Sequence, residues 1–120
     1  MNNAARFLAG ALALLGAGCA TIPDEPPAVS VTGVWRGQWQ RGSFSGTAEL
    51  TLEQMEARVT GDLKWGGCAA CTAISGPLQG TVSANRLSYS TTRASGELLV
   101  TGDEATGRYG SATVQLHRQR

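Results

Sequence analysis

The chain has 120 residues, with ten Lys and Arg against nine Asp and Glu and a formal net charge of +1. A charge so close to neutral argues against a nucleic-acid-binding protein, which needs clustered basic side chains. Charged residues make up only 16% of the chain while glycines number sixteen. Together with frequent Thr, Ser and Val, this composition indicates short strands joined by tight turns.

The first eighteen residues have the features of an export signal. Arg6 and the free amino group make a positive start, and residues 7–16 contain no polar side chain. An apolar run of about ten residues fits a signal-peptide core and is shorter than the ~20 residues of a membrane-spanning helix. We therefore predict a signal helix over residues 1–18 that is removed from the mature chain.

The stretch Gly16-Ala17-Gly18-Cys19 resembles the lipobox of bacterial lipoproteins, where the signal is cut before a lipid-bearing cysteine. Gly16 departs from the family, which usually has Leu at that place. The resemblance implies that Cys19 is diacylated and N-acylated, with palmitate among its chains, and so anchors the protein to a membrane. A neutral Ala20 resembles outer-membrane cargo, facing the periplasm or the cell surface. An ordinary cleaved signal, cut after Ala20, is the alternative.

Residues 19–32 are expected to form a tether. This segment contains Pro23, Pro26 and Pro27 and shows no apolar period. Such a segment is partly extended as polyproline II, at about 3 Å per residue. We predict a spacer between the lipidated Cys19 and one small domain over residues 33–120.

From Gly33 onward the sequence alternates with a period of two and shows no helical period. The even-numbered residues from Phe44 to Leu52 are mostly apolar, whereas the intervening Thr and Glu side chains suit a solvent-exposed face. The expected strands cover residues 33–39, 44–53, 57–65, 78–82, 87–91, 98–102, 107–109 and 112–116.

Eight alternating strands in sequential antiparallel order bury one face, and no helix is available to cover it. Curling the sheet into a barrel covers that face and removes the sheet edges. Inward glycines support strong coiling, because a strand interior otherwise loses stability with Gly. The glycines expected on the inner face are Gly37, Gly46, Gly61, Gly80, Gly102 and Gly107. The prediction is an all-β fold, a small eight-stranded antiparallel meander barrel, with complete or incomplete closure left open.

The stretch Thr32-Gly33-Val34-Trp35 resembles the opening of calycin barrels, the lipocalin and avidin group, whose first strand carries a Gly-x-Trp. The resemblance implies that Trp35 closes one barrel end and that Arg118 of the last strand lies over its ring, a cation–π contact. The chain is shorter than a typical lipocalin, so any cavity should be small. The same opening resembles small periplasmic barrels that inhibit secreted metalloproteases.

Two cysteines, Cys68 and Cys71, remain after Cys19 is assigned to the anchor. Their spacing is that of a redox motif, but a reactive pair needs a helix N-terminus, and these residues lie between two strands. In an oxidising compartment a disulfide that pins the loop is expected. Redox activity and metal binding are alternatives, although no second Cys or His pair completes a four-ligand site.

No catalytic constellation is evident. His117 is the only histidine and lies on the outward side of the last strand, whereas nucleophilic catalysis needs an oriented histidine beside a serine. The adjacent Asp103 and Glu104 fall in a predicted turn, where solvated carboxylates are ordinary. We expect no enzymatic activity, no cofactor and no metal.

The aromatic side chains suggest what the barrel binds. Trp35, Trp39 and Trp65 form either the core or the lining of a barrel mouth, where Tyr89 would offer a hydroxyl to a ligand. The first hypothesis is a membrane-anchored, non-enzymatic envelope lipoprotein whose barrel binds a small apolar ligand or lipid. The alternative is a protein-interaction module, either a protease inhibitor or an accessory subunit of an envelope complex.

Overall fold

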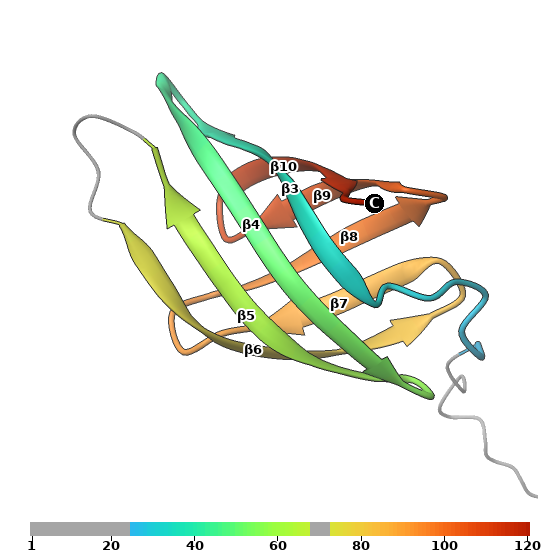
Figure 1. Ribbon diagram of the computed structural model, residues 1–120. Helices are drawn as coiled ribbons and strands as arrows, with labels where there is room; N and C mark the ends of the chain where they lie inside the picture. The colour runs from blue at the N-terminus through green and yellow to red at the C-terminus, as the bar shows by residue number, and fades with distance from the viewer. Residues whose placement is uncertain (1–24, 68–72) are drawn as a thin grey trace, which may run out of the picture.

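The strands of the protein close into one barrel in the computed structural model, which describes residues 25–67 and 73–120 (Figure 1). Each strand pairs antiparallel with the next along the chain, and β10 pairs with β3 to complete the circle. This confirms the predicted eight-stranded antiparallel barrel and shows that it is closed. The strands are β3 (Gly33–Arg41), β4 (Phe44–Met55), β5 (Arg58–Gly66), β6 (Ile74–Ser83), β7 (Arg86–Ser90), β8 (Ser95–Thr101), β9 (Glu104–Tyr109) and β10 (Ala112–Arg118).

The alternation in the sequence determines which face of each strand turns inward. In β4, Leu50 and Leu52 are buried while Thr51 between them is exposed, because successive side chains of a strand point to opposite faces. The prediction for Gly102 was wrong: this residue lies exposed in the β8–β9 turn with φ at 62°. A turn needs that left-handed conformation, which glycine adopts without strain. No helix among the described residues is long and apolar enough to cross a membrane.

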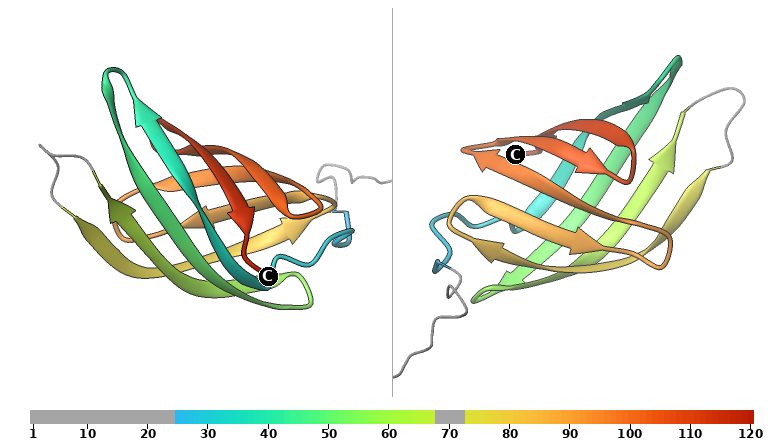
Figure 2. Two further views of the ribbon diagram at one scale, coloured as in Figure 1. Left: turned by 45° about the horizontal axis from the view of Figure 1, so that its top comes forward. Right: turned by 180° about the vertical axis from the view of Figure 1, so that it is seen from behind.

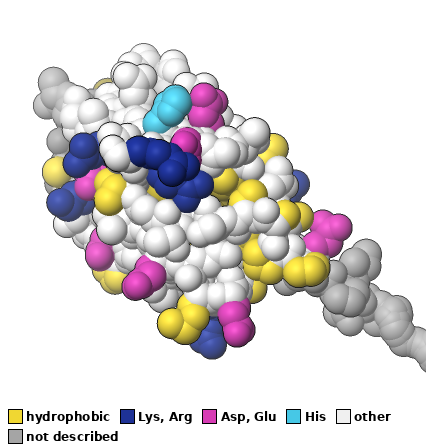
Figure 3. Space-filling model, turned by 45° about the vertical axis from the view of Figure 1, so that its right-hand side comes forward, with side chains coloured by type: hydrophobic (Ala, Val, Ile, Leu, Met, Phe, Trp, Pro, Cys, Tyr) yellow, Lys and Arg dark blue, Asp and Glu magenta, His cyan; other side chains and the backbone are white. Residues whose placement is uncertain are grey.

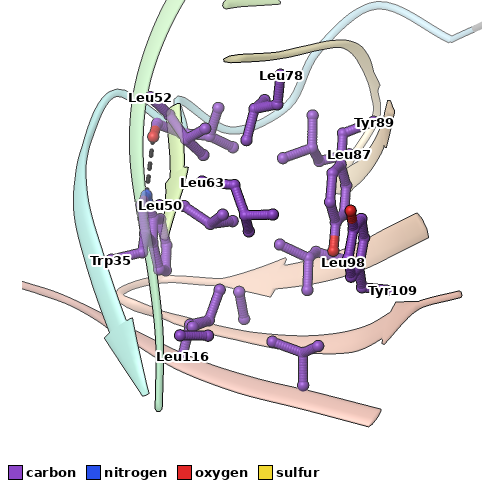
Figure 4. Packing of buried hydrophobic residues seen from close by; sticks show 14 of the residues in the cluster. Trp35, Leu50, Leu52, Leu63, Leu78, Leu87, Tyr89, Leu98, Tyr109 and Leu116 are labelled. Carbon is purple, nitrogen blue, oxygen red and sulfur yellow. Dashed lines mark hydrogen bonds between the residues drawn. The ribbon is translucent and has the colours of Figure 1, made fainter. Parts of the chain in front are cut away.

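Side chains fill the interior of the barrel. Twenty hydrophobic residues are buried, and no polar or charged residue in the described part of the chain is buried with them. Leu50, Leu63, Leu87 and Leu98 converge from different strands, each at most 2% exposed (Figure 4). Gly37 lets β10 approach closely, since a Cβ at this position would collide with the carbonyl oxygen of Gln115. The interior is therefore a packed core.

The hairpins divide the barrel into two different ends (Figure 2). We call one the mouth end; the β3–β4, β7–β8 and β9–β10 turns lie there. The other is the strap end, which carries the β4–β5, β6–β7 and β8–β9 turns together with the start of β3 and the finish of β10. The segment of residues 26–32, which we call the strap, lies on this end.

Trp35 and Arg118 close the strap end. The guanidinium carbon of Arg118 lies 4.5 Å from the centroid of the Trp35 ring, which confirms the stacking that the Gly-x-Trp resemblance implied. The Trp35 indole Nε1 donates a hydrogen bond of 2.9 Å to the carbonyl oxygen of Val31. Gly33 has a φ of 140°, and a Cβ there would meet the Arg118 Cδ at 3.1 Å. The motif needs glycine because the arginine side chain occupies that space.

Arg118 also joins two further segments, the strap and the β8–β9 turn, to β10 through its guanidinium nitrogens. Nη1 donates to the carbonyl oxygens of Ser30 at 2.8 Å and Thr32 at 3.0 Å, both in the strap. Nη2 donates to the Gly102 carbonyl oxygen at 2.9 Å, and Nε donates to Asp103 Oδ1 at 3.0 Å. The planar fork of arginine can hold several acceptors at once in this way, which the point charge of lysine cannot.

Asp103 is held by two arginines. Arg120 donates Nε to Asp103 Oδ2 at 2.7 Å and Nη2 to Oδ1 at 2.6 Å, alongside the contact from Arg118. The hydrogen bond from Arg120, supported by that from Arg118, lowers the pKa of Asp103 to about 2. The carboxylate therefore stays ionised throughout the neutral and mildly acidic range.

The side chain of Gln54 holds the strap from the other side. Its Oε1 accepts a hydrogen bond of 2.8 Å from the backbone N–H of Val31, and its Nε2 donates to the Val29 carbonyl oxygen at 3.3 Å. The N–H of Ala28 donates to the Ala84 carbonyl oxygen at 2.8 Å. Val31 is completely buried. Part of the segment expected to be a tether thus packs against the barrel.

Replacing Arg118 tests this closure. We expect Arg118→Met, which keeps much of the volume, to lower the free energy of unfolding by about 2 kcal/mol, because it removes a cation–π contact and several charge-assisted hydrogen bonds. Arg118→Lys should restore only part of that loss. Urea denaturation measures both. The control is Arg93→Ala in the exposed β7–β8 turn, with a change within about 0.5 kcal/mol. Equal effects at the two positions would contradict this role of Arg118.

Candidate functional site

Four aromatic side chains lie across the mouth end of the barrel. Trp39, Trp65, Tyr89 and Tyr109 come from the alternate strands β3, β5, β7 and β9. The two tryptophan rings stack with centroids 5.0 Å apart, Trp65 is tilted against Tyr109 at 5.0 Å, and the tyrosine rings stack at 5.9 Å. Each side chain is at most 8% exposed. These four rings, which we call the aromatic quartet, seal the mouth end.

Three side chains of the aromatic quartet, those of Trp39, Tyr89 and Tyr109, form hydrogen bonds within the protein. Trp39 Nε1 donates to the Gly66 carbonyl oxygen at 3.1 Å, and the Tyr89 hydroxyl donates to the Arg108 carbonyl oxygen at 3.2 Å. The Tyr109 hydroxyl shares a hydrogen bond of 2.6 Å with Thr91 Oγ1. Burial, with a smaller effect of Tyr109, raises the pKa of the Tyr89 phenol well above its ordinary value.

The structure separates the residues that sequence analysis grouped as ligand contacts. Trp39, Trp65 and Tyr89 meet at the mouth end, whereas Trp35 lies at the strap end under Arg118. Tyr109 belongs with the first three and was missed, although its alternation with Gly107 and Ala105 already placed it on the inner face. The predicted lipidation site Cys19 and the predicted disulfide of Cys68 and Cys71 lie outside the described residues.

Phe44 is an exposed aromatic side chain on the rim of the mouth. It is the first residue of β4 and is 49% exposed. The β3–β4 hairpin that carries it projects beyond its neighbours at the upper left of Figure 1. Phe44 continues the inward row of Gly46 and Ala48, but it lies at the end of the strand, where about half of it stays exposed. The result is an apolar contact point at the mouth.

A groove of about 510 Å³ lies near the mouth on the outer wall formed by β3 to β6. Gly66 and Ala73 occupy outward positions here, and because their side chains are small, the surface is depressed between the larger side chains around them. A cross-strand row of polar side chains borders it, since Arg36 faces Glu49, Glu49 faces Lys64, and Lys64 faces Ser75 in the strand register. The lining residues are Arg36, Gly37, Thr47, Ala48, Glu49, Lys64, Trp65, Gly66, Ala73, Ile74 and Ser75.

The charges along this groove are not all paired. Arg36 Nε lies 3.2 Å from Glu49 Oε1. Within the part of the chain that the structure describes, Lys64 has no ion-pair partner. The ammonium group of Lys64 could therefore pair with an anionic group of a molecule bound in this groove, whose lining is mostly apolar.

Three further depressions, of about 530, 470 and 340 Å³, also lie along the outer wall. Their linings alternate between inward and outward residues of neighbouring strands, as expected for spaces between ridges of surface side chains. The inward residues among them, such as Tyr89 and Trp39, belong to the core and are nearly fully buried, so the outward residues beside them form the accessible surface. Binding at any of these depressions would occur on the outside of the barrel.

His117 is exposed on β10, and its Nε2 lies 3.6 Å from Glu104 Oε2 (Figure 3). Over residues 25–67 and 73–120, no three His, Cys, Asp or Glu side chains come together in a group that could hold a metal ion. The features near the mouth end that could contact a partner or ligand are the exposed ring of Phe44, the shallow outer groove and the side chain of Lys64.

The closed, eight-stranded antiparallel barrel is compatible with a calycin-like barrel. No protein-family model, curated protein or solved structure matches the chain.

The stacked tryptophans give a spectroscopic test of the aromatic quartet. Two indole rings with centroids 5.0 Å apart and planes 14° from parallel should couple and produce an exciton couplet in the far-ultraviolet circular dichroism spectrum. We expect Trp65→Phe to abolish the couplet and Trp35→Phe, at the opposite end, to retain it. A couplet lost in the Trp35 variant and kept in the Trp65 variant would contradict the stacking.

Proposed function

We propose that the protein is a lipid-anchored envelope protein without enzymatic activity, whose barrel is a rigid scaffold that presents its mouth end to a protein partner. One observation carries this proposal: the interior is filled with side chains while Phe44 is exposed on a projecting hairpin. Aromatic side chains are enriched in the centres of protein interfaces and often dominate their binding energy.

The anchor is supported by the sequence. Residues 1–18 have the charge and apolar length of a signal peptide, and the following Cys19 stands in a stretch that resembles a lipobox. Acylation there would attach the barrel to the outer membrane, facing the periplasm or the cell surface. A Cys68–Cys71 disulfide would suit such an oxidising compartment.

The filled interior favours a protein partner over a small ligand. Sites for small apolar molecules are usually enclosed, of roughly 300–1,000 Å³, and bury most of the ligand. Here the corresponding space holds core side chains such as Leu50 and Leu98. The outer groove shares strand β4 with Phe44 and has Lys64 at its border. An apolar partner segment with an acidic side chain would match both features.

A small apolar ligand or lipid bound at the groove is the second candidate. It is supported by Gly66 and Ala73, whose small size leaves room in the groove, and by the calycin-like arrangement of the barrel. In this case the ligand would lie against the outer wall, and Lys64 would favour one that carries a negative charge.

Site-specific cross-linking tests the proposed partner. With a photoreactive phenylalanine analogue at position 44, we expect one dominant protein adduct in the native cells. Leu99, which is 46% exposed on β8, is the matched control and should give none. Phe44→Ala should weaken binding to the isolated partner about 10-fold or more. Adducts of equal yield at both positions, or unchanged affinity, would contradict the interface. A stoichiometric apolar ligand in native mass spectra would favour the second candidate.

A further inference from the structure

We propose that the strap end of the barrel is a membrane-contacting surface, with the lipid bilayer covering the tip of the β4–β5 hairpin and the mouth end directed away. This orientation rests on the lipid anchor at Cys19 that we proposed above. It follows from where the chain leaves the barrel, how far the remaining residues can reach, and which side chains surround the exit.

The chain leaves the barrel at a fixed place. The strap is bonded to β4 through Gln54, to β10 through Arg118 and to the β6–β7 turn through Ala84. These contacts involve three different parts of the barrel and include the buried Val31. The path toward Cys19 therefore starts at the strap end, and a small swing of the strap cannot move its start to the mouth.

The remaining chain is too short to reach the other end. Cys19 and Glu25 are separated by six residue steps, which span at most about 21 Å at ~3.5 Å each. The twelve residues of β4 extend about 37 Å along the strand, or about 28 Å along the axis of a barrel whose strands tilt by roughly 40°. With Cys19 in the bilayer, the mouth end cannot face the membrane.

The side chains around the exit suit a lipid interface. Met55, at the tip of the β4–β5 hairpin, is 76% exposed, and Ala57 of the same hairpin is exposed, as are Ala28 and Pro26 of the strap. Gln54 joins this tip to the strap, so these apolar groups lie on one end of the barrel. Figure 3 shows hydrophobic side chains gathered where the described chain begins.

The charges at the strap end are mixed in sign. Glu56 and Arg58 flank the hairpin tip, Glu25 is exposed where the described chain begins, and Arg120 is paired with Asp103. Anionic lipids attract surfaces that carry several basic residues, which this tip lacks. The contact should therefore depend on apolar insertion at the headgroup boundary rather than on the fraction of anionic lipid.

Three exposed apolar residues make matched fluorescence probes. Met55 and Phe44 stand at the two ends of β4, and Leu99 lies on the outer wall. Each is replaced by Trp in the full lipidated chain, which is reconstituted in phosphatidylcholine vesicles containing a lipid with a nitroxide near its headgroup. Emission is compared with the parent chain, whose three tryptophans are buried. Equal thermal transitions in detergent establish that all the variants fold alike.

We expect the nitroxide lipid to quench the added tryptophan of Met55→Trp about twofold, because interfacial side chains lie within about 5–10 Å of the headgroup boundary. Leu99→Trp should be quenched less and Phe44→Trp hardly at all, and adding anionic lipid should not change this order. Vesicle flotation with equal quenching at all positions, or strongest quenching at Leu99→Trp, would overturn the orientation alone. A full chain purified from its native membranes whose mass shows no acyl groups on Cys19 would overturn both the anchor and the orientation.

Discussion

The contact between Arg118 and Trp35 is the interaction on which the rest of the structure depends. It joins the last strand to the first, and the same guanidinium reaches the strap and the β8–β9 turn. A meander of strands has two edges until such a seam forms, and unpaired edges promote association with other chains. Asp103 supports the seam because its carboxylate accepts hydrogen bonds from both Arg118 and Arg120. Closure thus relies on one residue that satisfies several backbone carbonyl groups at once.

The two ends of the barrel differ in the residues that cover them and in the side chains that they leave exposed. The strap, residues 26–32, covers the strap end. Val31 is buried there, and the side-chain amide of Gln54 accepts one hydrogen bond from the strap and donates another to it. The mouth end is sealed by the aromatic quartet, but Phe44 remains exposed beyond it. Because the core is filled between the two ends, the outer wall and the rim are where a partner can make contact. Such a scaffold would present the residues that contact a partner at the mouth end, opposite the end where the chain leaves toward the anchor.

Much of the fold could be predicted from alternation, since a period of two determines both the strands and their inner faces. Leu50 and Leu52 were assigned to the inner face on this basis and are buried there. The position of Gly102 could not be predicted in this way, because a left-handed turn interrupts the alternation at that residue. The strap could not be predicted either: its contacts come from Gln54 and Arg118, which lie 22 or more residues away in the sequence. Only the closed register brings Tyr109 to Trp65, so the aromatic quartet depends on tertiary structure.

The amide protons at the seam between β3 and β10 test closure most directly. If the barrel is closed in solution, the amides that pair across this seam should exchange with solvent as slowly as those between β4 and β5, because opening either pair requires comparable unfolding. Exchange measured residue by residue by nuclear magnetic resonance gives the comparison. Fast exchange confined to β3 and β10, with β4 and β5 still protected, would show an open sheet and contradict the closure by Arg118.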